Sequence, residues 1–280
     1  MQLALRDRIL DLSEPVVMGV LNVTPDSFSD GGQHTGIDAA VARGERMVEE
    51  GAAIVDVGGE STRPGAAPVS VEEEIRRVVP VIERLAARIG APVSVDTSKP
   101  EVIRAAVAAG ASMVNDVRSL RRAGALEAAA ASGAAVCLMH MQGEPATMQD
   151  EPRYEDVVAE VRAFLASRVA ACGTAGIPRE RICVDPGIGF GKTAGHNLAL
   201  LAHLDDLGAD GLPVLVGVSR KSVVGIITGR APGERLAGSV AFAALAVARG
   251  ASIVRAHDVA ATVDAVRVGS ALRSAMTGGA

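Results

Sequence analysis

The stretch Val16–Asn22 has the sequence VVMGVLN, six residues without a polar side chain followed by an amide. Seven further short apolar runs also end in a polar or charged group. Runs of this kind are typical of parallel strands that are covered on both faces. The alternative is that these polar residues merely begin loops. It would explain one such ending, but it is a poor explanation for eight. The seven other polar ends are Asp56, Asp96, Asn115 with Asp116, His140, Asp185, Ser219 with Arg220 and Lys221, and Arg255.

Between these runs the hydrophobic spacing changes to that of helices. The clearest case is residues 70–89, where Ser70 and Glu73 form a capping-box pair before apolar residues that recur on one face. Asp38 is expected to cap an earlier helix that runs to Glu50. Alternating strands and helices predict a parallel sheet with helices outside it.

Eight such units in one chain predict a (β/α)8 TIM barrel. The length of 280 residues suits one barrel, and no linker or low-complexity tract divides residues 1–280. We therefore expect a single domain. The polar groups at the carboxyl ends of the strands are expected to converge on one site.

The composition excludes several classes of function. The chain has no Trp, one Tyr and a net charge of −5, which argues against base stacking and against a nucleic-acid partner. No apolar run reaches membrane-spanning length and no signal pattern begins the chain, so we expect a cytoplasmic protein. The three cysteines are interpreted as small buried hydrophobic residues rather than as a disulfide or metal site.

Two loops after strands are longer than simple connectors. They cover residues 22–32 after the first barrel strand and residues 58–65 after the second, and both are expected over the active face of the barrel. Their glycines, hydroxyls and charged residues suit a cover that excludes water from a reactive intermediate. The alternative is that they are only elaborate surface loops.

The segment Asp185–Thr193, DPGIGFGKT, resembles a nucleotide-binding loop, but Pro186 stands where that pattern requires its first glycine. It is better interpreted as a strand that ends at Asp185 and is followed by a glycine-rich turn. Phe190 within it either forms a wall for a flat ligand or anchors the loop.

The remaining polar residues divide into acids and cations. Buried strand-end acids need donors, which come either from neighbouring backbone and Arg or from a ligand with an N–H edge, such as a pterin or purine. Asn22 is suited to a magnesium ion carried in by a polyphosphate. The residues by themselves therefore predict a barrel enzyme that binds a phosphorylated, nitrogen-rich small molecule.

The chain also resembles a known family, the dihydropteroate synthases, over residues 18–259. The resemblance rests on seven motifs in the family's order and spacing. It implies transfer of the pterin of 6-hydroxymethyl-7,8-dihydropterin diphosphate to 4-aminobenzoate, with Mg2+ and release of diphosphate, in a homodimer. The motifs are NVTPDSFSDGG at 22–32, GGESTRPG at 58–65, VDTS at 95–98, ND at 115–116, DPGIGFGK at 185–192, SRKS at 219–222 and RAHDV at 255–259.

The resemblance also implies a role for each site residue. The residues implied to bind the pterin are Asp96, Asn115, Asp185 and Lys221. Those implied to bind diphosphate are Asn22, Thr62, Arg255 and His257, with Asn22 also the metal ligand. Those implied to frame 4-aminobenzoate are Arg63, Pro64, Phe190, Lys221 and Ser222. The catalytic set is Asp30, Arg63, Asp96 and Lys221.

Departure of diphosphate would leave a pterin methylene cation, which the neutral aryl amine attacks. Carboxylates such as Asp96 and Asp30 would stabilise that cation, although Asp30 beside Gly31 is equally suited to forming a turn. Two rival functions differ in class: a barrel lyase or aldolase with Lys221 as a Schiff-base amine, and a pterin-binding protein without activity.

Overall fold

The computed structural model describes residues 1–23, 32–61, 67–144, 147–208, 210–276 and 278. Within them, eight parallel strands pair in the order β8-β7-β6-β5-β4-β3-β10-β9. A bridge between Val184 and Val214 joins the two ends of this sheet, so it closes into a barrel. The strands are β3 (Val16–Asn22), β4 (Ile54–Gly58), β5 (Val93–Asp96), β6 (Met113–Asp116), β7 (Ala135–Met139), β8 (Ile182–Asp185), β9 (Leu215–Gly217) and β10 (Ile253–Ala256).

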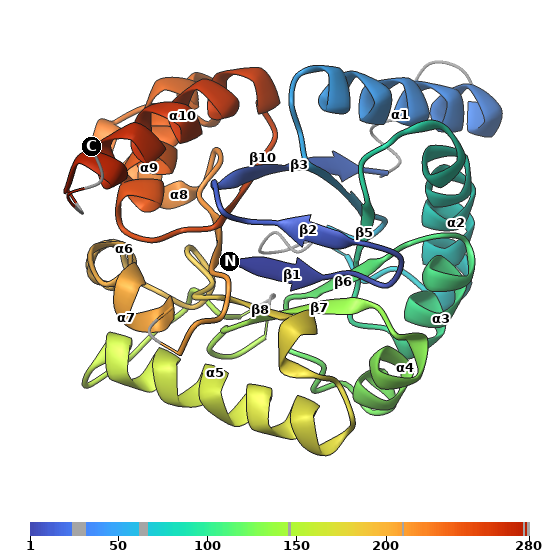
Figure 1. The fold of residues 1–280 in the computed structure, drawn as a ribbon, viewed down its shortest axis with the longest axis horizontal. Helices are drawn as coiled ribbons and strands as arrows, with labels where there is room; N and C mark the ends of the chain where they lie inside the picture. Colours follow the sequence, from blue (N-terminus) through green and yellow to red (C-terminus); the bar gives the residue numbers. More distant parts are fainter. Residues whose placement is uncertain (24–31, 62–66, 145–146, 209, 277, 279–280) are drawn as a thin grey trace.

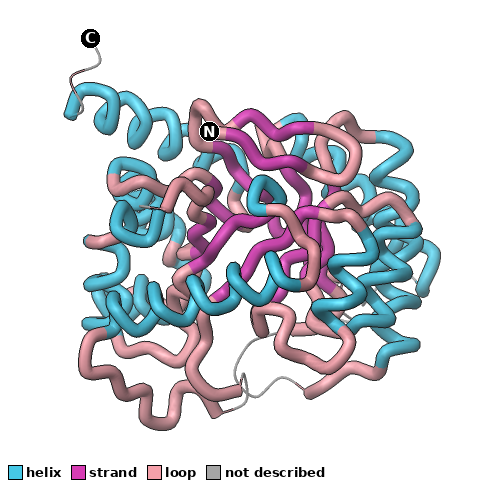
Figure 2. The backbone as a smooth tube through the Cα atoms, turned by 60° about the horizontal axis from the view of Figure 1, so that its bottom comes forward, coloured by secondary structure: helices cyan, strands magenta, loops and turns pink. Residues whose placement is uncertain are grey.

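Helices surround the barrel, and Figure 2 shows them outside the strands. The expected (β/α)8 TIM barrel is confirmed. The helices are α1 (Gly32–Glu49), α2 (Val71–Arg88), α3 (Pro100–Ala108), α4 (Ala125–Ser132), α5 (Val157–Thr174), α6 (Ala194–Ala202), α7 (Leu204–Gly208), α8 (Ser222–Thr228), α9 (Leu236–Ala248) and α10 (Val259–Met276). Short 3-10 turns lie at Arg179–Arg181 (η2) and Pro232–Glu234 (η3).

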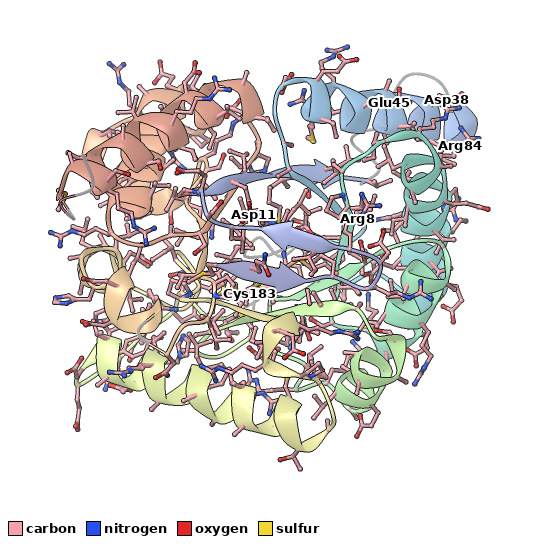
Figure 3. All side chains as sticks on the ribbon, in the orientation of Figure 1. Arg8, Asp11, Asp38, Glu45, Arg84 and Cys183 are labelled. Carbon is pink, nitrogen blue, oxygen red and sulfur yellow. The ribbon has the colours of Figure 1, made fainter. Side chains whose placement is uncertain are left out.

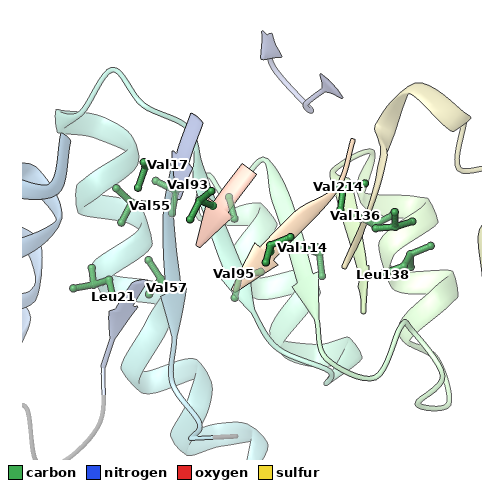
Figure 4. Packing of buried hydrophobic residues seen from close by; sticks show 14 of the residues in the cluster. Val17, Leu21, Val55, Val57, Val93, Val95, Val114, Val136, Leu138 and Val214 are labelled. Atoms are coloured by element: carbon green, nitrogen blue, oxygen red, sulfur yellow. The ribbon is translucent and has the colours of Figure 1, made fainter. Parts of the chain in front are cut away.

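Alternating strand residues form two apolar cores. Val17 and Val55 point outward and pack with the helices in the larger core, part of which Figure 4 shows. Met18 and Ile54, the neighbouring residues, belong to a second core inside the barrel. This alternation explains why each strand lacks a polar face and is apolar throughout.

A short hairpin, β1 (Gln2–Ala4) and β2 (Ile9–Asp11), precedes the barrel and lies across its centre in Figure 1. Leu3 of this hairpin is fully buried against Met18 and the other residues of the inner core. The hairpin therefore covers the amino-terminal end of the barrel strands. The sequence did not predict it.

Helix starts show one confirmed and one wrong prediction. The hydroxyl of Ser70 accepts from the Glu73 backbone N–H at 3.2 Å and caps α2 as expected, although the Glu73 carboxylate pairs with arginines instead. Asp38 does not cap a helix, because α1 begins at Gly32 and continues past it. Asp38 pairs instead with Arg84 of α2, and the two lie side by side in Figure 3.

The cysteines are free and buried, as the composition indicated. No helix in the described residues is long and apolar enough to cross a membrane.

Candidate active site

Arg255, on β10, connects several of the polar strand ends. Its Nε donates to Asp56 Oδ2 of β4 at 2.7 Å, and its Nη2 donates to Asp96 Oδ2 of β5 at 2.7 Å. The side-chain amide of Asn115, on β6, also donates to Asp56 Oδ2, at 3.0 Å. Side chains from four strands therefore converge at the carboxyl-terminal end of the barrel, as the sequence predicted.

Burial controls the charge of the acids in this group. It raises the pKa of Asp96 to about 7, an effect that Arg255 opposes and the neighbouring Asp56 reinforces. For Arg255, burial alone would lower the pKa, but Asp56 and Asp96 outweigh it and hold the pKa above its ordinary value. The pKa of Asp96 therefore lies above that of an exposed carboxyl group.

Asp116 differs from the other strand-end acids. It accepts hydrogen bonds from the Ser98 hydroxyl and from the backbone N–H groups of Arg118 at 2.8 Å and Leu120 at 2.7 Å. Ser119 and Leu120 have positive φ, so the carboxylate stabilises a tight turn. For Asp116, the donors come from the protein, which was one of the two possibilities that the sequence left open.

Asp185 and Lys221 form a second part of the site. Asp185 accepts from the Gly187 backbone N–H at 2.7 Å, and burial raises its pKa, while the nearby Lys221 opposes this rise. Burial lowers the pKa of Lys221 to about 8, with Asp185 opposing and Arg255 adding to the effect. The Lys221 ammonium donates to the Ile188 carbonyl at 2.5 Å.

Phe190 lies beside this pair. Its ring centroid is 4.6 Å from the Lys221 ammonium, and its side chain packs against a small cluster that includes Met139 and Met148. At Gly217, an added Cβ would lie 3.5 Å from Lys221 Nζ, so the backbone of β9 approaches the amine closely. An aromatic ring, a buried acid and an amine together suit a flat ligand with both donors and acceptors.

His257 and Asn22 occupy the positions just beyond β10 and at the end of β3. His257 Nδ1 is 3.0 Å from the Ser219 hydroxyl, which also accepts from the His257 backbone N–H at 3.2 Å. Asn22 is exposed, and a Cβ at Gly58 would lie 3.7 Å from its side-chain oxygen and 3.8 Å from Asp96 Oδ2. Asn22 therefore lies close to Asp96, while Ser222 is the exposed first residue of α8.

The sequence missed a buried lysine in the loop after β8. Lys192 is 3% exposed, and its ammonium donates to the carbonyls of Gly187 at 3.0 Å and Phe190 at 2.9 Å. It also lies 3.0 Å from His140 Nδ1, and burial lowers the pKa of Lys192 to about 7 and that of His140 to about 3. Lys192 thus fixes the loop that carries Phe190. The sequence feature that could have indicated this buried lysine is its position directly after four closely spaced turn residues.

Four expected site residues, Asp30, Thr62, Arg63 and Pro64, lie outside the described residues. In the part of the chain that the structure does describe, no group of three or more His, Cys, Asp or Glu side chains is arranged to hold a metal ion. The single amide oxygen of Asn22 fits a magnesium ion whose other ligands come from a substrate rather than from the protein.

Known proteins that are similar in sequence and fold identify the family. A family model described as pterin binding enzyme matches residues 18–257. The dihydropteroate synthase of Escherichia coli K12 is 55% identical over 275 residues, which cover 98% of each chain.

Two solved structures of the Xanthomonas albilineans dihydropteroate synthase are also similar. The complex with 4-aminobenzoic acid has a TM-score of 0.91 and 58% identity, covering 98% of each chain. The complex with 7,8-dihydropteroate has a TM-score of 0.88 and 55% identity, covering 98% of this chain and 99% of that one. Sequence, fold and the donor and acceptor groups of the site agree: this chain belongs to the pterin binding enzymes and, among them, to the dihydropteroate synthases.

Proposed function

We propose that the chain catalyses the reaction of its family at the site formed by Asp96, Asn115, Asp185 and Lys221. The substrates are 6-hydroxymethyl-7,8-dihydropterin diphosphate and 4-aminobenzoate, and the products are 7,8-dihydropteroate and diphosphate. The observation that carries the proposal is that the buried carboxyl group of Asp185 and the ring of Phe190 both lie near the Lys221 ammonium. A similar X. albilineans enzyme in complex with 7,8-dihydropteroate supports it.

In this proposal each donor and acceptor group of the pterin is assigned to one of these residues. The carboxylate of Asp185 accepts from the 2-amino and ring N–H edge, and the Lys221 ammonium donates to the 4-oxo oxygen. Asn115 both donates and accepts through its amide. A donor edge opposite a buried acid supplies charge-assisted hydrogen bonds, which are the strong ones in a site of low polarity.

The diphosphate is assigned to the neighbouring side of the site, with Arg255, His257, Asn22 and Thr62. Asn22 would hold Mg2+ that arrives with the diphosphate, and the ion would spread the charge of the leaving group. Arg255 already pairs with Asp56 and with Asp96, the second of which is assigned to the pterin, so a diphosphate bound to Arg255 would lie next to the pterin. Arg255 can therefore stabilise charge as the bond to diphosphate breaks.

The 4-aminobenzoate is assigned to Arg63, Pro64, Phe190, Lys221 and Ser222. Its amine is neutral at pH 7 and needs no strong base. Breaking the bond to diphosphate leaves a methylene cation conjugated with the pterin nitrogens. The carboxyl groups of Asp96 and Asp30 stabilise that cation, and attack by the amine gives the product after loss of one proton.

A homodimer is part of the proposal. Helices α8, α9 and α10 lie side by side in Figure 1 and expose large apolar side chains, which a second copy would cover. Sedimentation of the purified chain should give twice the monomer mass. The side chains are Ile226, Ile227, Leu236, Leu245, Val268, Leu272 and Met276. The expected cytoplasmic location stays a prediction.

The proposed function is tested by turnover of the purified chain. Diphosphate release should require both 4-aminobenzoate and magnesium. Pterin binding without release of diphosphate would support the rival binding protein. A covalent adduct at Lys221 that borohydride traps would support the rival aldolase, whereas a synthase forms none.

A further inference from the structure

A second buried lysine, Lys99, lies outside the groups described so far. Its side chain is 6% exposed, and it follows β5 directly before α3. The ammonium donates to three acceptors: the Val69 carbonyl at 2.7 Å, Glu60 Oε2 at 2.9 Å, and Glu74 Oε2 of α2. A buried ammonium has no other way to replace its hydration, so these contacts define its position.

Two of the three acceptors of Lys99 come from the two ends of one loop. Glu60 lies shortly after β4, and Val69 lies shortly before α2. The two ends also bond directly, because the Val69 backbone N–H donates to Glu60 Oε1 at 3.0 Å. Arg77 of α2 donates to the Gly59 carbonyl at 2.8 Å and holds the first end a second time. The separation between the two ends is thereby fixed.

Lys99 also belongs to the segment that carries Asp96. Its backbone N–H donates to the Thr97 hydroxyl at 3.3 Å, and the Thr97 N–H donates to the Asn115 carbonyl at 3.0 Å. A single side chain therefore connects the end of β5, where the pterin is assigned, to both ends of the loop that contains Arg63 and Pro64.

Burying the charges of Lys99 and Glu74 costs desolvation free energy, so this ion pair is a poor source of stability by itself. Glu74 is fully buried, and among the described residues its Oε1 has no hydrogen-bond partner. Apolar side chains of similar volume often stabilise a protein as well as a buried ion pair does, whereas charged groups fix geometry. The buried network is therefore better explained by a need to hold these groups in position than by stability alone.

We propose that Lys99, held by Glu74 and bonded to Glu60, is a positioning residue for the 4-aminobenzoate subsite. It fixes the spacing of the two ends of the loop at residues 61–68. The inference rests on the proposed function, because it takes Arg63 and Pro64 to frame 4-aminobenzoate. Lys99 itself does not contact substrate.

The test measures the two substrates separately in Lys99→Met, which keeps the apolar stem and removes the ammonium. Affinity for 4-aminobenzoate, measured with diphosphate present, should fall by about 10- to 100-fold, as expected when a binding group is displaced by about 1 Å. Affinity for pterin diphosphate should change by no more than about two-fold, because its groups stay in place. Lys99→Arg, which keeps the charge, should restore part of the lost affinity.

A second variant keeps the test valid if Lys99→Met folds poorly. In Lys99→Met/Glu74→Gln no buried carboxylate is left without its cation, while the loop ends still lose their shared donor, so the same selective loss is expected. Arg181→Met is the matched control, since Arg181, the last residue of η2, donates to the Gly133 carbonyl at 2.6 Å ahead of the amino-terminal end of β8, away from the site. It should lower the melting temperature and leave both affinities unchanged.

Hydrogen exchange gives a readout other than binding. Amides in residues 58–70 should exchange faster in the Lys99 variants than in Arg181→Met, with little change elsewhere. Equal losses for both substrates, or unchanged affinity for 4-aminobenzoate in a folded variant, would overturn the proposal. Arg63→Ala distinguishes failure of the site assignment from failure of the positioning role. If Arg63→Ala leaves the affinity for 4-aminobenzoate intact, the assignment of Arg63 to this subsite is wrong. If Arg63→Ala lowers that affinity but the Lys99 variants leave it intact, the positioning role of Lys99 is wrong.

Discussion

At the scale of single residues, Asp185 has two tasks that can be separated by substitution. It accepts from the Gly187 backbone N–H, and it is assigned to the donor edge of the pterin. Asp185→Ala removes both, so we expect a loss of about 2–5 kcal/mol in binding of pterin diphosphate, the range for truncating one partner of a buried charge pair. Calorimetry on the folded variant measures it.

Asp185→Asn is the matched control, because its amide oxygen still accepts from Gly187. It should keep the stability of the wild-type chain and lose much of the pterin affinity. Near-native affinity in folded Asp185→Ala would remove this residue from the pterin site.

Lys221 gives a prediction about pH. Its pKa is lowered to about 8, chiefly by burial, so the ammonium is lost as pH rises through that value. The kcat/KM for pterin diphosphate should then decline, because the donor to the 4-oxo oxygen weakens and kcat/KM reports groups of the free enzyme. Measurements of kcat/KM between pH 7 and about 9.5 test this, because that range covers the titration of a single group with a pKa of about 8.

Unfolding does not produce the same decline through Lys221. Since its folded pKa lies below the ordinary 10.5, the unfolded chain binds more protons between these values, and this residue adds stability as pH rises. Lys221→Met should have low activity with a flat profile over the same range. An unchanged decline in that variant would assign the pH dependence to another group.

At the scale of elements, the loop after β8 is held by close backbone approach. Gly187 has φ +69°, and an added Cβ would lie 1.9 Å from the His140 carbonyl oxygen. Gly229, with φ +71°, has no atom within 4 Å of such a Cβ. Both alanine variants carry the strain of positive φ, about 1–2 kcal/mol, but only Gly187→Ala adds a backbone clash.

Urea unfolding should therefore show a modest loss of stability for Gly229→Ala and a clearly larger one for Gly187→Ala. Pterin affinity should fall only in Gly187→Ala, since the shift moves the N–H that Asp185 accepts from. Equal effects of the two substitutions would mean that the loop relaxes around the clash.

The elements that the sequence predicted are those with a strong apolar pattern. The barrel strands were recognisable because both of their faces are buried, as Val17 and Met18 illustrate. The hairpin was missed because each of its strands has three residues, too few for a period to be seen. The start of α1 was misplaced at Asp38, a good capping residue that forms an ion pair with α2 instead.

The sequence pattern also explains which site residues were predicted and which were missed. Asp96, Asn115 and Asp185 stand at or beside strand ends, Arg255 is the last residue but one of β10, and Asp56 lies inside β4, which continues to Gly58 rather than ending at Asp56 as expected; the closed barrel brings this side of its strands together. Lys99 and Lys192 were missed because lysine in a loop is usually exposed. Only the folded chain shows that backbone carbonyls surround the Lys192 ammonium and that one carbonyl and two carboxylates surround that of Lys99, since no local pattern brings these acceptors together.

At the scale of the whole molecule, the barrel separates stability from activity along its axis. The hairpin covers the amino-terminal ends of the strands, and the polar groups lie at the carboxyl-terminal ends. Between them lies the inner core, with Met18, Ile54 and Met113 fully buried. In barrels of this kind the first end contributes stability and the second carries the chemistry.

Leu3 tests this division. It is fully buried in the hairpin against the inner core, so Leu3→Ala should cost about 2–5 kcal/mol of unfolding free energy, the range for truncating a buried Leu. Well below the melting temperature, kcat/KM for both substrates should equal that of the wild-type chain, because Leu3 packs in the inner core, at the end of the barrel opposite to the polar groups. Leu198→Ala, at a Leu that is 44% exposed, is the control and should change stability by less than about 0.5 kcal/mol. A fall in kcat/KM of the folded Leu3→Ala protein would mean that packing at one end of the barrel sets the geometry at the other, and the two functions of the barrel would then be coupled through the inner core.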